Sequence, residues 1–181
     1  MINVPDSERL TFSLMSEVHA DLLWQLDQDP EVMRFLNGGK VTSRTELEQR
    51  FLPRMAAYRD PFNGWGLWQS VEKVSGEFLG WTLVRPMGFF TDRRDDSDLE
   101  LGWRYKRSSW GNGYATEAAY AIMMAIRQQT GITRFSATVA EENTASIAIM
   151  KKLGMSYLKT DHNYPGPNGP ETALYYTVSL E

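Results

Sequence analysis

The sequence contains no cysteine and only two histidines, and both scarcities limit its chemistry. Without cysteine, the chain has no disulfides, no thiolate nucleophile and no cysteine-ligated zinc. A serine–histidine–aspartate triad would have to use His19 or His162, and no nucleophile-elbow motif lies near either residue. The sequence therefore gives no support to nucleophilic catalysis of these kinds.

The chain also lacks an excess of positive charge and any long apolar run. Its net charge is −4 and no long basic segment occurs, which argues against nucleic acid as a direct partner. No apolar run is long enough to span a membrane, and the first ten residues show no basic region followed by an apolar stretch. We therefore expect no membrane partner, no signal peptide and a cytoplasmic location.

What the chain does contain is typical of a globular protein. Hydrophobic residues make up 42% of its 181 residues and charged residues 23%. Six tryptophans, eight tyrosines and eight phenylalanines can fill a core and line a cleft. No internal repeat or low-complexity linker divides the sequence, so we expect a single domain over residues 1–181.

The N-terminal third predicts one strand followed by short helices. Leu10, Phe12 and Leu14 alternate on one face of the expected strand. Asp29 precedes Pro30 as a helix N-cap would, and a Ser-x-x-Glu capping box opens a later helix. The expected elements are a strand over 7–15 and helices over 17–26, 29–36 and 43–58.

Strands predominate in the remainder, with two longer helices between them. A charged loop over 91–98 and a proline- and glycine-rich loop over 163–171 interrupt the pattern. The succession of strand, glycine loop, helix and strand predicts a parallel crossover, and hence a mixed α/β (α+β) fold around one central sheet. The expected elements are strands over 64–71, 76–86, 99–105, 133–140, 155–160 and 172–180, and helices over 114–129 and 144–153.

The segment SSWGNGYATEA, residues 108–118, places two glycines directly before an expected helix. Gly111 and Gly113 allow successive backbone N–H groups to turn toward one point, where the helix N-terminus also attracts a phosphate. A tight turn that binds nothing is the alternative. The segment is not a Walker A loop, since no Lys-Ser or Lys-Thr follows, and the third glycine of a dinucleotide fingerprint would fall at Thr116.

A second motif, ENTASIAIMKKLGM, begins at Glu142 after the next expected strand. Together with WGNGYATEA it resembles the motifs of the GNAT superfamily of acyl-CoA-dependent N-acetyltransferases, and more closely those of the RimJ/RimL-like branch, which acetylates protein N-termini. The segments ERLTF and DPEVMRFLNGG also resemble the start of that branch. The resemblance therefore extends over nearly the whole chain.

The resemblance implies a GNAT-like domain whose central sheet has a parallel strand pair splayed apart at the acetyl-CoA site. It implies transfer of an acetyl group from acetyl-CoA to a primary amine, foremost the α-amine of a protein or peptide N-terminus, without a metal. A small-molecule amine, such as an aminoglycoside or a polyamine, is an alternative acceptor. A non-catalytic acyl-CoA-binding module is a further alternative, and a homodimer is compatible with the resemblance.

The resemblance also assigns residues to the cofactor. The loop 110–116 would hold the pyrophosphate through backbone N–H groups, and the backbone of 101–104 would pair with the pantetheine arm, where Gly102 permits a close approach. Asn143 would hydrogen-bond the same arm, although a helix N-cap is its alternative role. The expected cofactor-binding residues are Leu101, Gly102, Trp103, Arg104, Trp110, Gly111, Asn112, Gly113, Tyr114, Ala115, Thr116, Asn143 and Ser146.

Glu100 matches the position of the general-base glutamate in several GNAT families. An amine acceptor needs such a base, because at neutral pH it is mostly ammonium and only the neutral form attacks. Strand alternation by itself favours an outward-facing Glu100 with no catalytic role. Asp98, two residues earlier on the same face, is the second candidate base.

Two positions depart from the family pattern. Ser108 stands where many members have arginine or glutamine, which removes one side-chain contact. Met150 stands where many have a tyrosine general acid, and a thioether cannot give a proton to the leaving thiolate. Tyr157, Tyr164 and His162 are candidates for the proton donor, with no positional support for any of them.

Overall fold

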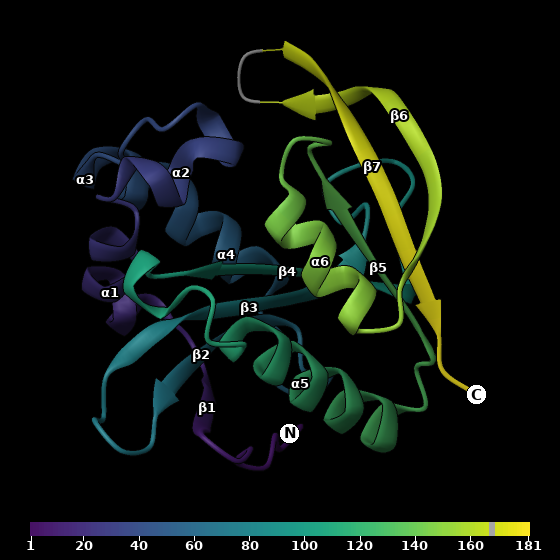
Figure 1. The fold of residues 1–181 in the computed structure, drawn as a ribbon, viewed down its shortest axis with the longest axis horizontal. Helices are drawn as coiled ribbons and strands as arrows, with labels where there is room; N and C mark the ends of the chain where they lie inside the picture. Colours follow the sequence, from purple (N-terminus) through teal and green to yellow (C-terminus); the bar gives the residue numbers. More distant parts are fainter. Residues whose placement is uncertain (167–168) are drawn as a thin grey trace.

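The computed structural model of the protein describes residues 1–166 and 169–181, and its centre is a seven-stranded sheet (Figure 1). The strand order is β1-β2-β3-β4-β5-β7-β6, and all neighbouring strands are antiparallel except β4 and β5. The strands span Leu10–Leu14 (β1), Gly66–Glu72 (β2), Phe78–Met87 (β3), Asp95–Tyr105 (β4), Arg134–Val139 (β5), Ser156–Gly166 (β6) and Gly169–Ser179 (β7).

The helices begin where the sequence supplies capping residues. Asp29 caps α2 by accepting a hydrogen bond from the N–H of Glu31 at 3.0 Å, and Ser43 caps α3 through the N–H of Glu46 at 3.0 Å. A π-helical turn, Leu47–Phe51, joins α3 to α4. The helices span Ala20–Leu26 (α1), Pro30–Asn37 (α2), Arg44–Glu46 (α3), Leu52–Tyr58 (α4), Tyr114–Thr130 (α5) and Thr144–Lys152 (α6).

Each face of the sheet has its own apolar core. Successive residues of a strand point to opposite faces, so Val84 of β3 packs in the core that contains α5 and α6, while Leu83 packs in the core of the N-terminal helices. Figure 1 shows α1 to α4 as a group separate from α5 and α6. β3 is apolar along nearly its whole length because both of its faces are covered.

The parallel pair β4 and β5 is short. The two strands pair at three positions of β4, residues 98–100, and β4 then continues to Tyr105 paired with β3. β5 continues instead along β7. On the side toward β5, the backbone of β4 after Glu100 has no strand partner in the described chain, and this is the splayed pair that the resemblance implies.

The predicted elements and the predicted mixed α/β fold are confirmed, with two differences in the strands. β4 begins at Asp95, so residues 95–98 of the predicted charged loop are strand. The sequence predicts a loop over 163–171, yet 163–166 belong to β6 and 169–171 to β7, while Pro167 and Asn168 lie outside the described residues. In both places backbone pairing extends a strand through polar or turn-forming residues. No helix in the described ranges has the length and apolarity needed to cross a membrane.

Candidate active site

The loop before α5 presents a row of free backbone donors. Gly111 and Gly113 have φ angles of +75° and +79°, a region that glycine adopts without strain. A Cβ at Gly111 would meet no atom within 4 Å, so the backbone conformation rather than packing requires glycine there. The N–H groups of residues 111–116 find no acceptor among the described residues, and the last three of these residues begin the 17-residue helix α5. Such adjacent donors at the positive end of a long helix suit a phosphate or pyrophosphate.

Arg9, the residue before β1, holds this loop in place. Its Nη1 donates to the carbonyl of Asn112 at 2.9 Å, and its Nε donates to Oε2 of Glu117 in α5 at 2.7 Å. Burial raises the pKa of the Glu117 carboxyl, but hydrogen bonds from Ser7 and Arg9 outweigh it and lower that pKa. The guanidinium of Arg9 also stacks 4.3 Å from the ring centroid of Tyr114. The loop is therefore fixed by side chains from the start of the chain.

The free edge of β4 lies next along the chain. Alternate N–H and C=O groups of residues 101–104 point toward β5 without a strand to pair with. A Cβ at Gly102 would lie 3.5 Å from Leu83, an ordinary contact, so the packing of the chain does not itself demand glycine. A free edge followed by a loop of free amides fits a long ligand with a phosphate end, as the implied acetyl-CoA has.

Asn143 and Ser146 lie across the splay from β4. Oδ1 of Asn143 accepts a hydrogen bond from the N–H of Ser146 at 3.2 Å, so the N-cap role is present. Oγ of Ser146 accepts from Nε1 of Trp103 at 3.2 Å, which joins α6 to β4. The predicted contacts of these residues with the cofactor stay predictions.

Glu100 lies at the last paired position of β4 and β5, where the two strands part. It is 9% exposed, so the alternative of a side chain that faces solvent does not hold, while its role as the base stays a prediction. Nε of Arg85 donates to Oε2 of Glu100 at 2.7 Å. Burial opposes the charge on Arg85, but the charge of Glu100 outweighs it and raises the pKa of the guanidinium. The structure describes no further hydrogen bond to this carboxylate.

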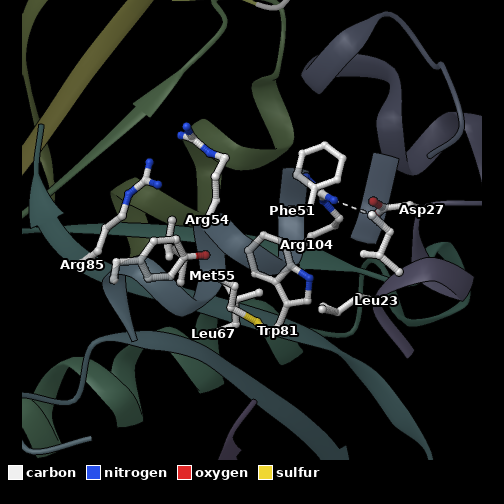
Figure 2. Close-up of a pocket in the computed structure, with 12 residues that line it drawn as sticks. Leu23, Asp27, Phe51, Arg54, Met55, Leu67, Trp81, Arg85 and Arg104 are labelled. Atoms are coloured by element: carbon white, nitrogen blue, oxygen red, sulfur yellow. Dashed lines mark hydrogen bonds and ion pairs between the residues drawn. The ribbon is translucent and has the colours of Figure 1, made fainter. Parts of the chain in front are cut away.

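A cavity of about 170 Å³ lies on the face covered by the N-terminal helices, and Arg85, the partner of Glu100, is part of its lining. Its walls come from α1, the π-helical turn, α4 and strands β2, β3 and β4. Figure 2 shows the guanidinium groups of Arg54 and Arg85 pointing to the same side of the cavity, while Arg104 turns toward Asp27. Nη1 of Arg104 donates to Oδ1 of Asp27 at 2.5 Å. The side chain of Arg104 thus belongs to this cavity, whereas the predicted cofactor contact concerned its backbone.

The charge of Glu100 affects the pKa values of three tyrosines, of which Tyr58 is buried and Tyr164 and Tyr175 are half-buried. Burial raises the pKa of Tyr58 to about 12, and burial with the charge of Glu100 raises the pKa of Tyr164. Burial, followed by the effects of Tyr164, Asp161 and Glu100, raises the pKa of Tyr175 to about 12. Tyr164 and Tyr175 form an edge-to-face pair with ring centroids 6.3 Å apart.

Of the three candidate proton donors, Tyr164 is the one near Glu100. Tyr157 is 55% exposed and bonds Thr160, and His162 lies in an exposed part of β6. Met150 is buried in the core beneath α6.

Asp98, the second candidate base, is occupied elsewhere. Its Oδ2 accepts a hydrogen bond from Ser136 at 2.8 Å and lies 3.1 Å from Nε of Arg134. Burial raises the pKa of Asp98, although Ser136 and Arg134 oppose the effect. These contacts join β4 to β5 at their paired end.

Arg54, Tyr58 and Arg85 were not among the residues predicted from the sequence. They come from α4 and β3, and no short motif connects them to Glu100. An arginine within the otherwise apolar strand β3 was the one available signal, because a charge buried in a sheet needs a partner. The pairing register, which places Arg85 opposite Glu100, supplies that partner.

Comparisons with known proteins agree with this geometry. A family profile described as "Acetyltransferase (GNAT) domain" matches residues 9–156. The FsC-acetyl coenzyme A-N(2)-transacetylase of Aspergillus fumigatus is 30% identical over 184 aligned residues, which cover 96% of this chain and 74% of that protein.

Two solved structures share the fold at low sequence identity. RimL, a ribosomal L7/L12 α-N-protein acetyltransferase in complex with coenzyme A, gives a TM-score of 0.71 at 17% identity, covering 98% of this chain and 97% of that one. The aminoglycoside acetyltransferase AAC(6')-Ib in complex with coenzyme A gives a TM-score of 0.71 at 16% identity and covers 94% of both chains. One of these enzymes is named for a protein acceptor and the other for aminoglycosides, so the shared fold does not identify the substrate class of this chain.

Proposed function

The chain belongs to the GNAT acetyltransferase family and is an acetyl-CoA-dependent N-acetyltransferase, and we propose that its acceptor is the α-amine of a protein or peptide N-terminus. One observation carries the proposal: Glu100 lies where β4 and β5 part, and its partner Arg85 lines a small cavity. Pockets for drug-sized ligands measure roughly 300–1,000 Å³. A cavity of about 170 Å³ suits the end of a peptide better than several linked sugar rings.

The chain's own backbone would hold the cofactor, which supplies the acetyl group as a thioester. The loop 110–116 binds the phosphates through its free N–H groups, and the edge of β4 at 101–104 pairs with the arm. Asn143 and Ser146 bind the arm from the opposite side of the splay.

Glu100 takes the proton from the acceptor ammonium. Arg85 occupies Oε2 and fixes the orientation of the carboxylate, while Oε1 receives no hydrogen bond from the described residues. A base held in this way removes a proton either directly or through a water molecule.

Tyr164 gives a proton to the leaving thiolate in place of the tyrosine that Met150 replaces. Burial raises its pKa, so the phenol keeps its proton at neutral pH. Its hydroxyl lies 3.4 Å from Oγ1 of Thr138 on β5, the strand that diverges from β4.

A small-molecule amine is the second candidate acceptor. The relative named as an N(2)-transacetylase is the observation that favours it. A panel assay separates the two candidates: release of the CoA thiol is measured with N-terminal peptides, polyamines and aminoglycosides at equal concentration. We expect peptides to give the highest kcat/KM. Preference for an aminoglycoside or polyamine would contradict the peptide acceptor, and CoA binding without any thiol release would indicate a non-catalytic module.

Several further expectations stay predictions. They are the extent of one domain over 1–181, the cytoplasmic location, the homodimer and the absence of nucleic-acid and membrane partners.

A further inference from the structure

The charges that surround the cavity do not balance. Three guanidinium groups line it, those of Arg54, Arg85 and Arg104. Arg85 is paired with Glu100 at 2.7 Å, and Arg104 is paired with Asp27 at 2.5 Å. In the described chain, no carboxylate lies within 4.0 Å of Arg54. The cavity therefore has one positive charge in excess.

Arg54 is exposed where α4 lines the cavity, and its surroundings oppose its positive charge. One face of its guanidinium stacks on Phe90, with the central carbon 3.8 Å from the ring centroid. Burial, and then the positive charges of Arg85 and Arg50, lower its pKa. An arginine does not lose its proton at ordinary pH, so an anion bound in the cavity would relieve this repulsion.

The opposite wall also has more donors than acceptors. Asp27 is 4% exposed, and its two oxygens accept from Arg104 and from the hydroxyl of Thr42 at 2.8 Å. Nε of Arg104 is buried and has no acceptor among the described residues. A cavity with unmatched donors on both walls is complementary to a ligand rich in oxygen acceptors.

We infer that the acceptor amine belongs to a molecule that also carries a carboxylate, and that Arg54 binds this carboxylate. The inference rests on the proposed use of the cavity as the acceptor site, and it narrows the class of acceptor. The carboxylate is either the α-carboxylate of a free amino acid or the acidic side chain of a residue near a peptide N-terminus. A guanidinium binds either one through paired N–H donors. A polyamine or an aminoglycoside brings further positive charge to a cavity that already has an excess.

Matched acceptors test the inference on the complete protein. The C-terminally amidated peptides Ser-Glu-Ala, Ser-Gln-Ala and Ser-Lys-Ala differ in one side chain, and glycine with glycinamide isolates the α-carboxylate. We expect kcat/KM to be at least tenfold higher for the acidic member of one of these sets, and the set that shows the preference identifies the source of the carboxylate. Equal rates across both sets, or faster acetylation of Ser-Lys-Ala, would overturn the inference and leave the acetyltransferase intact.

Variants assign the preference to Arg54. In Arg54→Gln we expect KM to rise about tenfold for the preferred acidic acceptor and to stay within twofold for its neutral partner, with kcat little changed. Arg54→Lys should restore part of the loss. Arg50→Gln is the matched control: it removes one positive charge nearby, from a side chain that is 58% exposed and pairs with Glu46. Equal losses for acidic and neutral acceptors in Arg54→Gln would overturn the assignment.

A binding measurement separates failure of the inference from failure of the proposed function. Calorimetry with CoA-saturated protein compares N-acetyl-Ser-Glu-Ala-amide with its Gln counterpart, and N-acetylglycine with N-acetylglycinamide. Tighter binding of an acidic probe that is lost in Arg54→Gln supports the inference even if no peptide is acetylated. Equal binding within both pairs overturns it, whatever the turnover.

Discussion

The two halves of the site are built from different materials. The half assigned to the cofactor consists of backbone: two left-handed glycines, a row of free N–H groups and a strand edge without a partner. The half assigned to the acceptor consists of side chains, and its central features are buried charges from β3, β4 and α4. Backbone donors bind a phosphate whatever the neighbouring side chains are, whereas side chains can select among acceptors. We therefore expect substitutions in the first half to change cofactor binding and substitutions in the second half to change the choice of acceptor.

The largest effect is expected from substitution of Glu100, in the half of the site assigned to the acceptor. Glu100→Gln should lower kcat by about 10²–10⁴-fold, because the amide keeps the size of the side chain but cannot accept the ammonium proton. The Kd for CoA, measured by calorimetry, should not change, since Glu100 belongs to the acceptor half. Raising the pH should recover part of the rate, because more of the acceptor amine is then neutral.

If the substitution merely distorted the site, the rate would not recover at high pH. The pH dependence therefore distinguishes loss of the base from distortion of the site. Full activity of Glu100→Gln at pH 7 would remove Glu100 from the mechanism. If Asp98→Asn alone lost the rate, Asp98 would be the base and the contacts of Asp98 with Ser136 and Arg134 would have to open.

Gly113 tests the backbone half. Gly113→Val should raise the Kd for CoA at least tenfold, because a β-branched residue strains a backbone with φ of +79° and moves the free amides. The strain itself should cost about 1–3 kcal/mol of folding stability. Gly131→Val at the other end of α5 is the matched control, since Gly131 has φ of +78° and open space around it. Both variants should lose similar stability in thermal unfolding, and equal CoA affinity in the two would contradict the phosphate loop.

Tyr164 tests whether the side-chain half also supplies the proton donor. Burial and the charge of Glu100 raise its pKa above the usual 10, so its proton is present at neutral pH and is lost only as the pH rises beyond that value. Tyr164→Phe should lower kcat about tenfold, a modest effect because a thiol leaves with little assistance. The wild-type rate should also fall at the alkaline end of a pH profile, and this fall should be absent in the variant. Tyr157→Phe, on the same strand, should leave the profile unchanged.

Asn143 tests whether a side chain also takes part in the half assigned to the cofactor, because it already caps α6. Asn143→Ala should cost on the order of 1 kcal/mol of stability through the lost cap. If Asn143 also binds the cofactor arm, the Kd for CoA should rise several-fold. Ser43→Ala removes a comparable cap on α3 and serves as the control in both measurements. Loss of stability with unchanged CoA affinity would leave Asn143 with the capping role alone.

The same contrast explains how much could be predicted from the sequence. The glycine loop was predictable because its features are local: Gly111 and Gly113 stand directly before α5, and a helix N-terminus always has free donors. The caps at Asp29 and Ser43 were predictable for the same reason. The splay of β4 and β5 followed from the family resemblance rather than from strand patterns.

The acceptor half was not predictable, because it depends on contacts between distant segments. Strand alternation placed Glu100 correctly on one face but did not tell whether that face was solvent or cavity. Its partner Arg85 is 15 residues away in the sequence, and the two meet only because β3 and β4 pair in one particular register. Arg54 comes from α4, and no sequence motif marks it. The extension of β4 to Asp95 was not predictable either, since residues 95–97 are polar and exposed and show no strand alternation.

The contacts of Arg9 bear on the entropy of binding. Ordering a flexible loop costs roughly 1–2 kcal/mol for each backbone residue that the ligand must fix. Here the bond from Arg9 to the carbonyl of Asn112, 103 positions away, orders the loop when the protein folds. A preorganised loop loses little conformational freedom on association, so more of the attraction to the phosphates appears as affinity. If the loop holds the phosphates as proposed, Arg9 contributes to cofactor affinity by restricting the loop in the free protein.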